Sequence, residues 1–180
     1  MEMRRLFIAT FVSKNLFERN YSNIQSAFEP VCKGKWTELH NLHLTYKFLG
    51  NVPIEKIPEI TEIIKDKLIE YPGTLKFNGL GVMPNPQRPQ VLYARVYSPE
   101  REVLGNYLEL EKRLTAYGFQ KEKRKFIPHV ALLRVKSFDD TFPEIYESNL
   151  ETYMGKQVGY KISLVASTLT HEGPVYEILV

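Results

Sequence analysis

Apolar residues recur along the chain at two spacings, one typical of strands and one typical of helices. Residues 5–12 are rich in apolar and β-branched side chains, so we expect a first strand there. After Ser13, a favourable N-cap, apolar side chains return every three or four residues until Pro30, and this spacing predicts an amphipathic helix. Its apolar side chains are Phe17, Tyr21, Ile24 and Phe28.

The same reasoning predicts elements along the rest of the chain. Helices are expected over residues 58–71, 99–117 and 142–153, and strands over residues 42–49, 74–83, 90–97, 126–134, 158–169 and 174–180. The order helix, strand, helix, strand, strand thus occurs twice. Strands that start at residues 42, 74 and 90 are each matched by a strand that starts 84 residues later. This constant offset indicates an internal duplication, with chance agreement of the boundaries as the alternative.

The duplication leads to a prediction of the fold class. We expect an α+β protein with two pseudo-symmetric lobes, each an antiparallel sheet with helices on its outer face, around a central groove. In this interpretation residues 1–180 form a single bilobal domain. The lobe-forming repeats are 13–97 and 98–180, and the strand 5–12 is added to one of them. Equivalent residues of the two repeats are then expected to face each other across the groove.

Composition and charge limit the classes of protein that fit. Of the 180 residues, 43% are hydrophobic and 25% are charged, which is typical of a globular domain and excludes collagen-like and disordered chains. The formal net charge of +3 is too small for binding long nucleic acid through many phosphates, but is compatible with one local phosphate. Cys32, the single cysteine, excludes an internal disulfide, so we expect a cytoplasmic location. No apolar run reaches the roughly 20 residues of a membrane helix, and we expect neither a membrane span nor a signal peptide.

Two of the four histidines occupy matching places in the predicted repeats. Strand alternation puts His43 and Thr45 on one face of the strand 42–49, and it puts His129 beside Ala131 in the strand 126–134. The two histidines are 86 residues apart, close to the repeat offset. Each lobe is therefore expected to supply one histidine to the groove.

Two histidines that face each other across a groove suit the cleavage of a phosphodiester. A neutral imidazole removes a proton from the attacking oxygen, while a protonated one gives a proton to the leaving oxygen. An ordinary histidine pKa near 6.5 allows both forms near neutral pH. A hydroxyl two residues further on, such as that of Thr45, can hold a nonbridging phosphate oxygen. This chemistry needs no metal and no cofactor.

The segments around these histidines resemble a known family. Asn41–Thr45 with Lys47–Gly50, and Pro128–Leu132 with Arg134, resemble the two His-x-Thr-x motifs of the 2H phosphoesterases. They are most similar to the RNA 2′,3′-cyclic phosphodiesterases, once described as 2′-5′ RNA ligases. The resemblance covers nearly the whole chain and includes Arg5–Ala9, Gly79–Gly81, Arg88, Pro89, Ser167 and Gly173–Tyr176.

The resemblance implies an enzyme that opens a terminal 2′,3′-cyclic phosphate of RNA to a 2′-phosphate without a metal. It implies His43 as the proton donor to the leaving 3′ oxygen, His129 as the proton acceptor that activates water, and Thr45 as a phosphate-binding residue. The residues alone do not decide which histidine is the acid. One departure from the family pattern is Ala131, where the second motif has threonine. We expect this alanine to weaken phosphate binding and to leave the proton transfers intact.

Further residues are candidates for binding phosphate. Lys47 alternates onto the His43 face if the strand is unbroken, whereas Arg134 lies an odd number of residues from His129 and needs a twist or bulge to reach it. We predict phosphate binding by both, with a surface ion pair as the alternative for each.

Candidates for contacting the rest of the substrate are Tyr46, Trp36 and Ser167. Alternation puts Tyr46 on the face opposite His43, where packing in the core is the alternative to base stacking. Trp36 precedes the strand of His43, and Ser167 enters through the family resemblance.

The remaining histidines and cations have simpler interpretations. His40 and His43 point to opposite faces of a strand, which argues against a metal site, and His171 lies in a predicted turn. Four cations, Lys121, Lys123, Arg124 and Lys125, precede the strand of His129. They form either a solvated loop or a surface that steers RNA.

Three functional hypotheses remain open. The first is hydrolysis of RNA terminal 2′,3′-cyclic phosphate. The second keeps the site and changes the substrate to a 2′-5′ linkage, with phosphodiesterase or ligase activity, or to a small cyclic nucleotide. The third is a catalytically impaired protein that binds RNA ends, which the presence of Ala131 favours. In each case we expect a monomer whose partners are RNA 3′ ends or small cyclic nucleotides, with no metal and no membrane.

Overall fold

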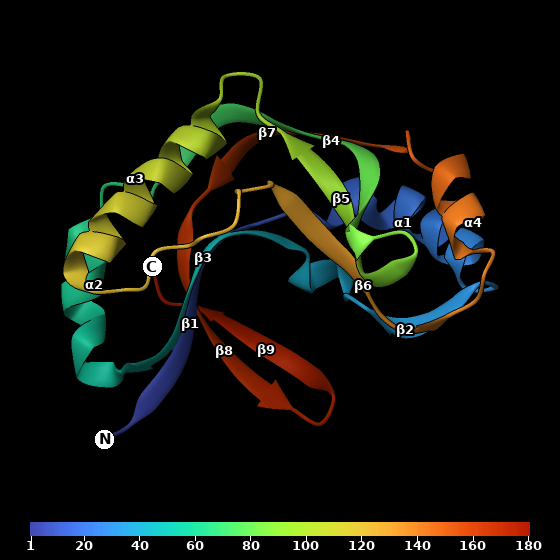
Figure 1. The fold of residues 1–180 in the computed structure, drawn as a ribbon. Coiled ribbons are helices and arrows are strands. Elements are labelled where there is room, and N and C mark those ends of the chain that lie inside the picture. The colour runs from blue at the N-terminus through green and yellow to red at the C-terminus, as the bar shows by residue number, and fades with distance from the viewer.

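A computed structural model describes all 180 residues, and its nine strands form one antiparallel sheet with four α-helices (Figure 1). The α+β fold class predicted from the sequence is confirmed. The strands are β1 Met3–Phe11, β2 Cys32–Trp36, β3 His43–Pro53, β4 Glu70–Asn85, β5 Arg88–Tyr97, β6 His129–Phe138, β7 Tyr153–Lys161, β8 Ser163–Thr170 and β9 Gly173–Ile178. The helices are α1 Lys14–Phe28, α2 Ile57–Ile64, α3 Glu102–Tyr117 and α4 Phe142–Ser148, with short 3-10 turns at Leu39–Asn41 and Ile54–Lys56. None of the helices is long and apolar enough to cross a membrane.

The sheet is divided in the middle into two lobes. Its order is β7-β4-β5-β6-β3-β1-β8-β9, with β2 added to β6. The two central strands, β6 and β3, share only the pair Leu44–Val130, so the sheet opens on either side of this pair. We call β7, β4, β5, β6 and β2 with α1 and α4 the β6 lobe, and β3, β1, β8 and β9 with α2 and α3 the β3 lobe. Figure 1 shows the two helix pairs at opposite ends of the molecule.

Strand pairing does not follow the boundaries of the two predicted repeats. The segment 13–97 contributes β3 to the β3 lobe but β4 and β5 to the β6 lobe. The segment 98–180 contributes β6 and β7 to the β6 lobe but β8 and β9 to the β3 lobe. Each segment therefore supplies strands to both lobes, and neither builds a lobe alone. The duplication itself stays a prediction.

Several element boundaries differ from those expected. The strand β2 was not expected, because only its two end residues are apolar and its middle is Lys-Gly-Lys. The helix expected over 58–71 ends at Ile64. Leu68 continues the apolar spacing and is buried, but it lies in the bend that follows the helix. Residues 126–128 lie outside β6 because Pro128 has no N–H for the ladder. The helix expected over 142–153 ends at Ser148, and the strand expected over 158–169 is two strands that separate at Ile162.

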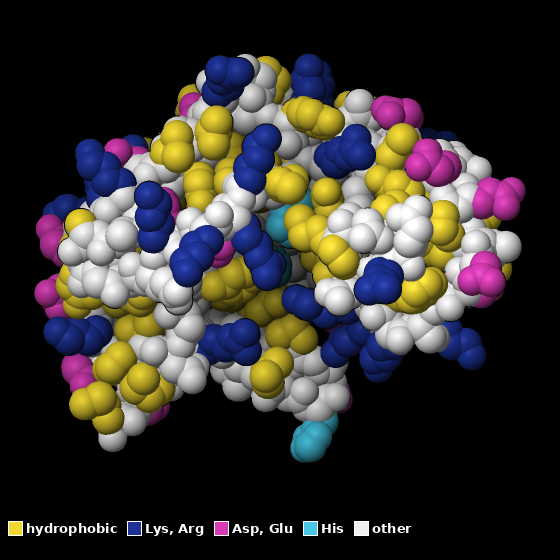
Figure 2. All heavy atoms as spheres, viewed as in Figure 1, with side chains coloured by type: hydrophobic (Ala, Val, Ile, Leu, Met, Phe, Trp, Pro, Cys, Tyr) yellow, Lys and Arg dark blue, Asp and Glu magenta, His cyan; other side chains and the backbone are white.

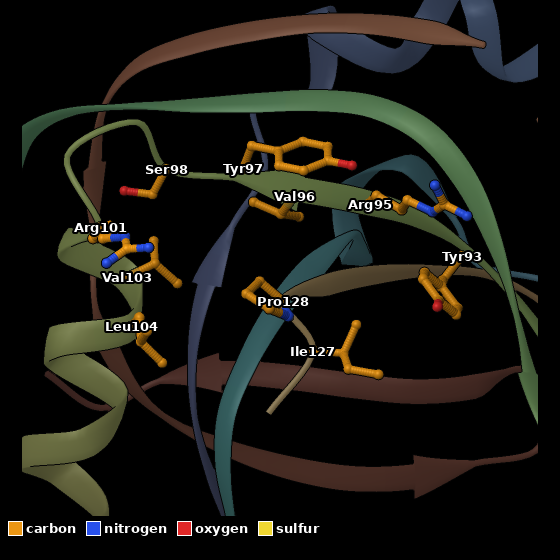
Figure 3. A pocket seen from close by; sticks show the side chains of 10 residues that line it. All are labelled: Tyr93, Arg95, Val96, Tyr97, Ser98, Arg101, Val103, Leu104, Ile127 and Pro128. Carbon is orange, nitrogen blue, oxygen red and sulfur yellow. The ribbon is translucent and has the colours of Figure 1, made fainter. Parts of the chain in front are cut away.

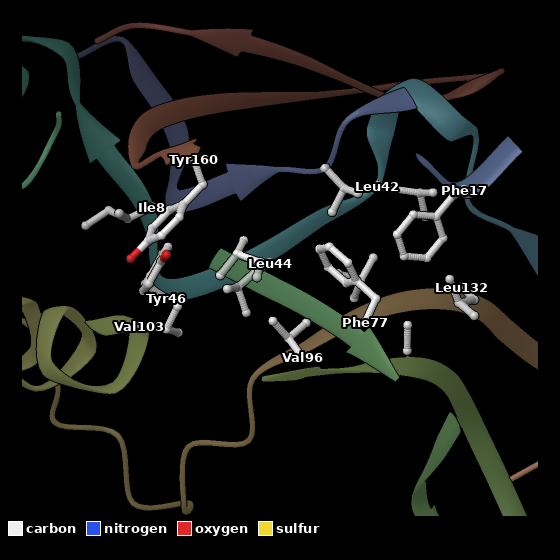
Figure 4. Packing of buried hydrophobic residues seen from close by; sticks show 14 of the residues in the cluster. Ile8, Phe17, Leu42, Leu44, Tyr46, Phe77, Val96, Val103, Leu132 and Tyr160 are labelled. Atoms are coloured by element: carbon white, nitrogen blue, oxygen red, sulfur yellow. The ribbon is translucent and has the colours of Figure 1, made fainter. Parts of the chain in front are cut away.

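One continuous core joins the two lobes. A single cluster of 38 buried residues includes Phe17 and Phe77 from the β6 lobe as well as Ile8 and Tyr46 from the β3 lobe. In Figure 4, Leu44 and Val96 lie between the two groups. Burial of one contiguous apolar cluster is characteristic of a single domain. The core therefore fixes the position of β3 against β6, and with it the position of the two histidines.

Candidate active site

His43 and His129 begin the two strands at which the lobes meet. Leu44 and Val130, the pair that joins these strands, are fully buried, so alternation turns the residues on either side of them to the opposite face. If the register continues by one residue, His43 lies opposite Ala131 and Thr45 lies opposite His129. The two predicted motifs are thereby brought together. Figure 2 shows histidine side chains within the hollow between the lobes, with Lys and Arg side chains around its rim.

The two histidines make matching hydrogen bonds to the backbone. The Nδ1 atom of His43 lies 2.6 Å from the carbonyl oxygen of Asn41, and that of His129 lies 2.7 Å from the carbonyl oxygen of Ile127. A carbonyl oxygen only accepts, so each Nδ1 donates and carries a proton. In the neutral ring Nε2 is then the free acceptor, available to a substrate in the groove.

Burial makes both imidazoles harder to protonate. It lowers the pKa of His43 below the ordinary value of 6.5, more than the hydrogen bond to Asn41 raises it, and the charges of His129 and Arg134 lower it further. Burial also lowers the pKa of His129, against the hydrogen bond to Ile127. The charges of His129 and Arg134 thus lie within electrostatic reach of His43.

A β-bulge follows each histidine at the same distance. In β3, Thr45 pairs with Ala9 and Lys47 with Ile8, so Tyr46 is an extra residue. In β6, Leu132 is the extra residue in the pairing with β5. Each extra residue comes three positions after its histidine. A bulge reverses the alternation of the residues beyond it, and this decides which later side chains reach the groove.

The bulge at Leu132 supplies what the prediction for Arg134 required. Beyond it, Arg134 shares the face of His129, and its charge reaches both His43 and Tyr176. Arg134 is exposed and has no ion-pair partner. It is therefore free to meet an anion in the groove.

The matching bulge at Tyr46 makes the prediction for Lys47 wrong. It turns Lys47 to the core face, where Nζ donates to Glu111 Oε2 at 2.7 Å and to the Gln120 carbonyl at 2.9 Å. The side chain is only 6% exposed. A buried lysine that is already paired with a carboxylate cannot bind phosphate in the groove.

Two predicted substrate contacts also belong to the core. Tyr46 is 3% exposed and its hydroxyl lies 3.1 Å from Thr10 Oγ1, so the core-packing alternative holds. Trp36 lies against the core and meets the ring of Tyr21 edge-on at 5.8 Å. Both predictions of base stacking are corrected.

Aromatic rings that the prediction did not include surround His43. Their centroids lie 5.2 Å (Phe7), 5.6 Å (Phe11) and 5.2 Å (Tyr176) from that of the imidazole. Ser167 pairs with Tyr176 and therefore lies on the same face; its contact with substrate stays a prediction. Strand alternation in 5–12 does group Phe7 with Phe11, but both faces of that strand are apolar, so the sequence has no signal that ranks them.

Tyr93 and Arg95 are the corresponding neighbours of His129. The Tyr93 ring lies 5.1 Å from the imidazole, and Arg95 pairs with His129 in the ladder. Gly81 pairs with Tyr93, and a Cβ at this glycine would lie 2.1 Å from a ring carbon. A side chain at position 81 would displace the ring, so glycine leaves the room that the ring occupies. An open pocket of about 310 Å³ extends from Tyr93 and Arg95 past Ile127 and Pro128 to the start of α3 (Figure 3).

Other candidates lie outside this site. No group of three or more His, Cys, Asp or Glu side chains is arranged to hold a metal, and His40 is an exposed neighbour of Glu38. His171 is exposed in the turn between β8 and β9.

Burial raises the pKa of the Cys32 thiol to about 11, which argues against a nucleophile. The four cations at 121–125 lie in the exposed loop between α3 and β6.

Comparisons with known proteins agree with the fold and the paired histidines. A family model described as LigT like Phosphoesterase matches residues 16–93. The RNA 2′,3′-cyclic phosphodiesterase of Aquifex aeolicus is 34% identical over 186 residues, which span 99% of this chain and 96% of that protein. The protein of the same name from Methanocaldococcus jannaschii is 33% identical over 97% of this chain and 98% of its own length.

Among solved structures, E. coli LigT complexed with 3′-AMP superposes with a TM-score of 0.79, over 99% of this chain and 97% of that chain. At 22% identity this likeness supports the fold alone. The full-length similarity to the two cyclic phosphodiesterases also supports membership of their family. The chain therefore belongs to the LigT-like family of 2H phosphoesterases and is an enzyme of that family.

Proposed function

We propose that this phosphoesterase hydrolyses the terminal 2′,3′-cyclic phosphate of RNA to a 2′-phosphate. The observation that carries the proposal is the pair of half-buried imidazoles at the junction of the lobes, each with Nδ1 bound to a backbone carbonyl and Nε2 free. The names of the relatives from Aquifex aeolicus and Methanocaldococcus jannaschii support the same substrate.

The reaction needs one neutral and one protonated imidazole. His129 Nε2 accepts a proton from water as the water oxygen bonds to phosphorus. His43 Nε2 donates a proton to the 3′ oxygen as the P–O3′ bond breaks, which leaves the phosphate on the 2′ oxygen. The assignment of the acid and the base follows the family motif. Each such proton transfer typically contributes 10²- to 10⁴-fold in rate.

The phosphate is held by groups on the same face. Thr45 donates its hydroxyl to a nonbridging oxygen, and the Arg134 guanidinium balances the negative charge. Ala131 offers no hydroxyl at the matching position of β6. Arg134, from the same strand, is a cation on this face that can compensate for this loss.

The proposal is tested by incubating the protein with an oligoribonucleotide that ends in a 2′,3′-cyclic phosphate and following the products by phosphorus NMR. We expect a 2′-phosphate, an unchanged rate in EDTA, and one ¹⁸O atom in the product phosphate from labelled water. His43→Ala and His129→Ala should each lose at least 10²-fold in kcat. His40→Ala and His171→Ala serve as controls and should retain the wild-type rate. A 3′-phosphate product, or a rate that depends on metal, contradicts the proposal.

A second candidate function is binding of RNA ends without turnover, which Ala131 favours because one phosphate donor is missing. The same assay separates the two. Absence of any product at stoichiometric enzyme, with tight binding of the oligomer, would establish the binding protein in place of the hydrolase.

A further inference from the structure

A surface that carries basic and aromatic side chains lies beside His129, outside the groove, and has no role in the hydrolysis proposed above. It occupies the outward face of β5, β4 and β7, on the same side of the sheet as His129. Along β5, Tyr93, Arg95 and Tyr97 alternate onto this face, and Arg95 pairs with His129. Tyr97 pairs with Lys76 in β4, which in turn pairs with Lys156 in β7. These paired residues thus form a continuous row from His129 across β5, β4 and β7.

Two side-by-side pockets follow this ladder and share Tyr97. The first, of about 310 Å³, lies between Arg95 and Arg101. The second, of about 520 Å³, is lined by Lys76, Asn78, Tyr97, Tyr153 and Lys156, which we call the tyrosine–lysine face. Figure 3 shows Tyr93, Arg95 and Tyr97 along one stretch of β5 at the boundary of the first pocket.

The charged side chains on this face are all cations, and two of its tyrosine rings are exposed. None of the residues that line the two pockets is Asp or Glu, whereas four are Lys or Arg. Tyr97 is 50% exposed and Tyr153 is 56% exposed, although both belong to strands of a sheet whose opposite face is the core. Exposed aromatic rings flanked by cations on a sheet match the chemistry of single-stranded RNA, which offers bases for stacking and phosphates for ion pairing. An acidic peptide would use the lysines but would leave the rings uncovered.

The distance from the histidines determines which part of an RNA would lie here. Neighbouring strands are about 4.8 Å apart, so β7 lies three spacings, roughly 14 Å, from β6. The groups at Tyr153 and Lys156 are therefore better placed for the nucleotides that precede the terminal one than for the phosphate between His43 and His129.

We propose that the tyrosine–lysine face binds the nucleotides that precede the cyclic phosphate, so that the enzyme acts on RNA strands in preference to mononucleotides. Tyr97 and Tyr153 stack on bases, and Lys76 and Lys156 pair with backbone phosphates. This inference rests on the proposed function for the location of the RNA end. It adds that several nucleotides are recognised, and by which residues.

The test compares kcat/KM for 2′,3′-cyclic AMP with that for oligoribonucleotides of about two to eight nucleotides that carry a terminal 2′,3′-cyclic phosphate. We expect kcat/KM to rise with length, through KM, and then to level off once the strand spans the face. Tyr153→Ala should remove roughly 5- to 100-fold of the gain with the longest oligomer, the range of one base stacked on an aromatic ring, while cyclic AMP hydrolysis stays within about twofold.

Lys76→Gln with Lys156→Gln should lower the salt dependence of oligomer binding by about 1.4 in the log–log slope, since each phosphate contact with a single strand adds about 0.7. The matched control is Lys65→Gln with Lys112→Gln. It removes two exposed lysines of the β3 lobe and leaves the tyrosine–lysine face intact. The control should leave both substrates unaffected.

The outcomes separate this inference from the proposed function. Hydrolysis of cyclic AMP and of the oligomers at equal kcat/KM would overturn the inference and leave the proposed function standing. If neither is hydrolysed, the proposed function fails. Binding of a 2′-phosphorylated oligomer, measured by fluorescence anisotropy, then tests the inference, because the same variants should weaken this binding. Displacement of the oligomer by polyglutamate at equal charge concentration would assign the face to an acidic protein partner and overturn the inference.

Discussion

His43 and His129 have nearly the same surroundings. Each ring donates from Nδ1 to the carbonyl oxygen two residues earlier, and each lies about 5 Å from a tyrosine ring, that of Tyr176 or Tyr93. The proposed acid and the proposed base therefore differ in the rest of their surroundings. His43 carries the additional influence of the charges on His129 and Arg134, which lower its pKa.

In the proposed mechanism, the lowered histidine pKa values set the pH dependence of the reaction. Below both values the base is protonated, and above both values the acid is neutral, so activity is highest between them. Because burial holds both pKa values below 6.5, we expect a bell-shaped profile of kcat/KM whose maximum lies on the acid side of pH 6.5. Steady-state rates on a 2′,3′-cyclic phosphate across this range measure the profile. A maximum at clearly alkaline pH would show that other groups transfer the protons.

Ala131 allows a direct test of phosphate binding. It is half-buried on the face of His129, where a threonine hydroxyl would point into the groove. We expect Ala131→Thr to raise kcat/KM by about 10-fold or more, because a hydrogen bond to a charged group contributes roughly 1.5–3 kcal/mol. Ala131→Val adds the same bulk without the hydroxyl and should give no gain. Equal rates for the threonine variant and the wild type would mean that Arg134 already compensates for the missing hydroxyl.

Among the elements, the bulges in β3 and β6 contribute most to the site. One bulge exposes Arg134 to the groove, and the other takes Lys47 out of it. The buried Lys47 then acts on a third element. It bonds to Glu111 of α3 and to the Gln120 carbonyl, and Glu111 Oε1 accepts from the Glu122 N–H at 2.7 Å. The pair thus fixes the start of the loop that carries the four cations.

Breaking this buried pair should destabilise the protein. Burial alone would raise the pKa of Glu111, but the hydrogen bonds from Lys47 and the Glu122 N–H outweigh it and hold the pKa below its usual value. We expect Lys47→Met to lower the free energy of unfolding by about 3–5 kcal/mol, since it leaves a buried carboxylate without its cation. Urea denaturation measures the change.

Two further variants check the origin of that loss. Lys47→Met combined with Glu111→Leu removes both charges and should recover most of the stability. Lys65→Ala breaks an exposed ion pair with Glu62 and should leave the urea midpoint nearly unchanged. If the double variant is as unstable as Lys47→Met, packing rather than charge explains the effect.

At the scale of the whole molecule, the exchange of strands between the two halves of the sequence joins the lobes. Both lobes contain strands from both halves of the sequence, and one cluster of 38 buried residues extends through them. The groove between the lobes is thus a surface feature above a shared core. This explains how two histidines far apart in sequence hold a fixed relative position.

The shared core predicts that the lobes unfold together. Trp36, the single tryptophan, reports on the β6 lobe, whereas far-UV circular dichroism reports on helices of both lobes. We expect the two signals to change at the same urea concentration and the calorimetric enthalpy to equal the van't Hoff enthalpy. Separate transitions for fluorescence and circular dichroism would mean that the lobes fold as independent units.

Much of this fold and site could be predicted from the sequence because the signals are local. Apolar spacing predicted the helices, and strand alternation put His43 with Thr45 and Ala131 with His129 on one face. The features that could not be predicted all depend on how distant strands pair. β2 is too short and polar to carry a pattern, and its position depends on pairing with β6. Phe7 reaches His43 only through the pairing of β1 with β3, and Tyr176 only through the further pairing of β8 and β9 with β1.

The sequence by itself determined the α+β class and the residues able to transfer protons, since periodicity and side-chain chemistry are properties of short segments. Only the tertiary structure decided which cations face the groove. Lys47 and Arg134 follow their histidines at similar distances, yet paired bulges send one to the core and the other to the site. A bulge arises from the register between two strands, and that register depends on residues far away in the chain.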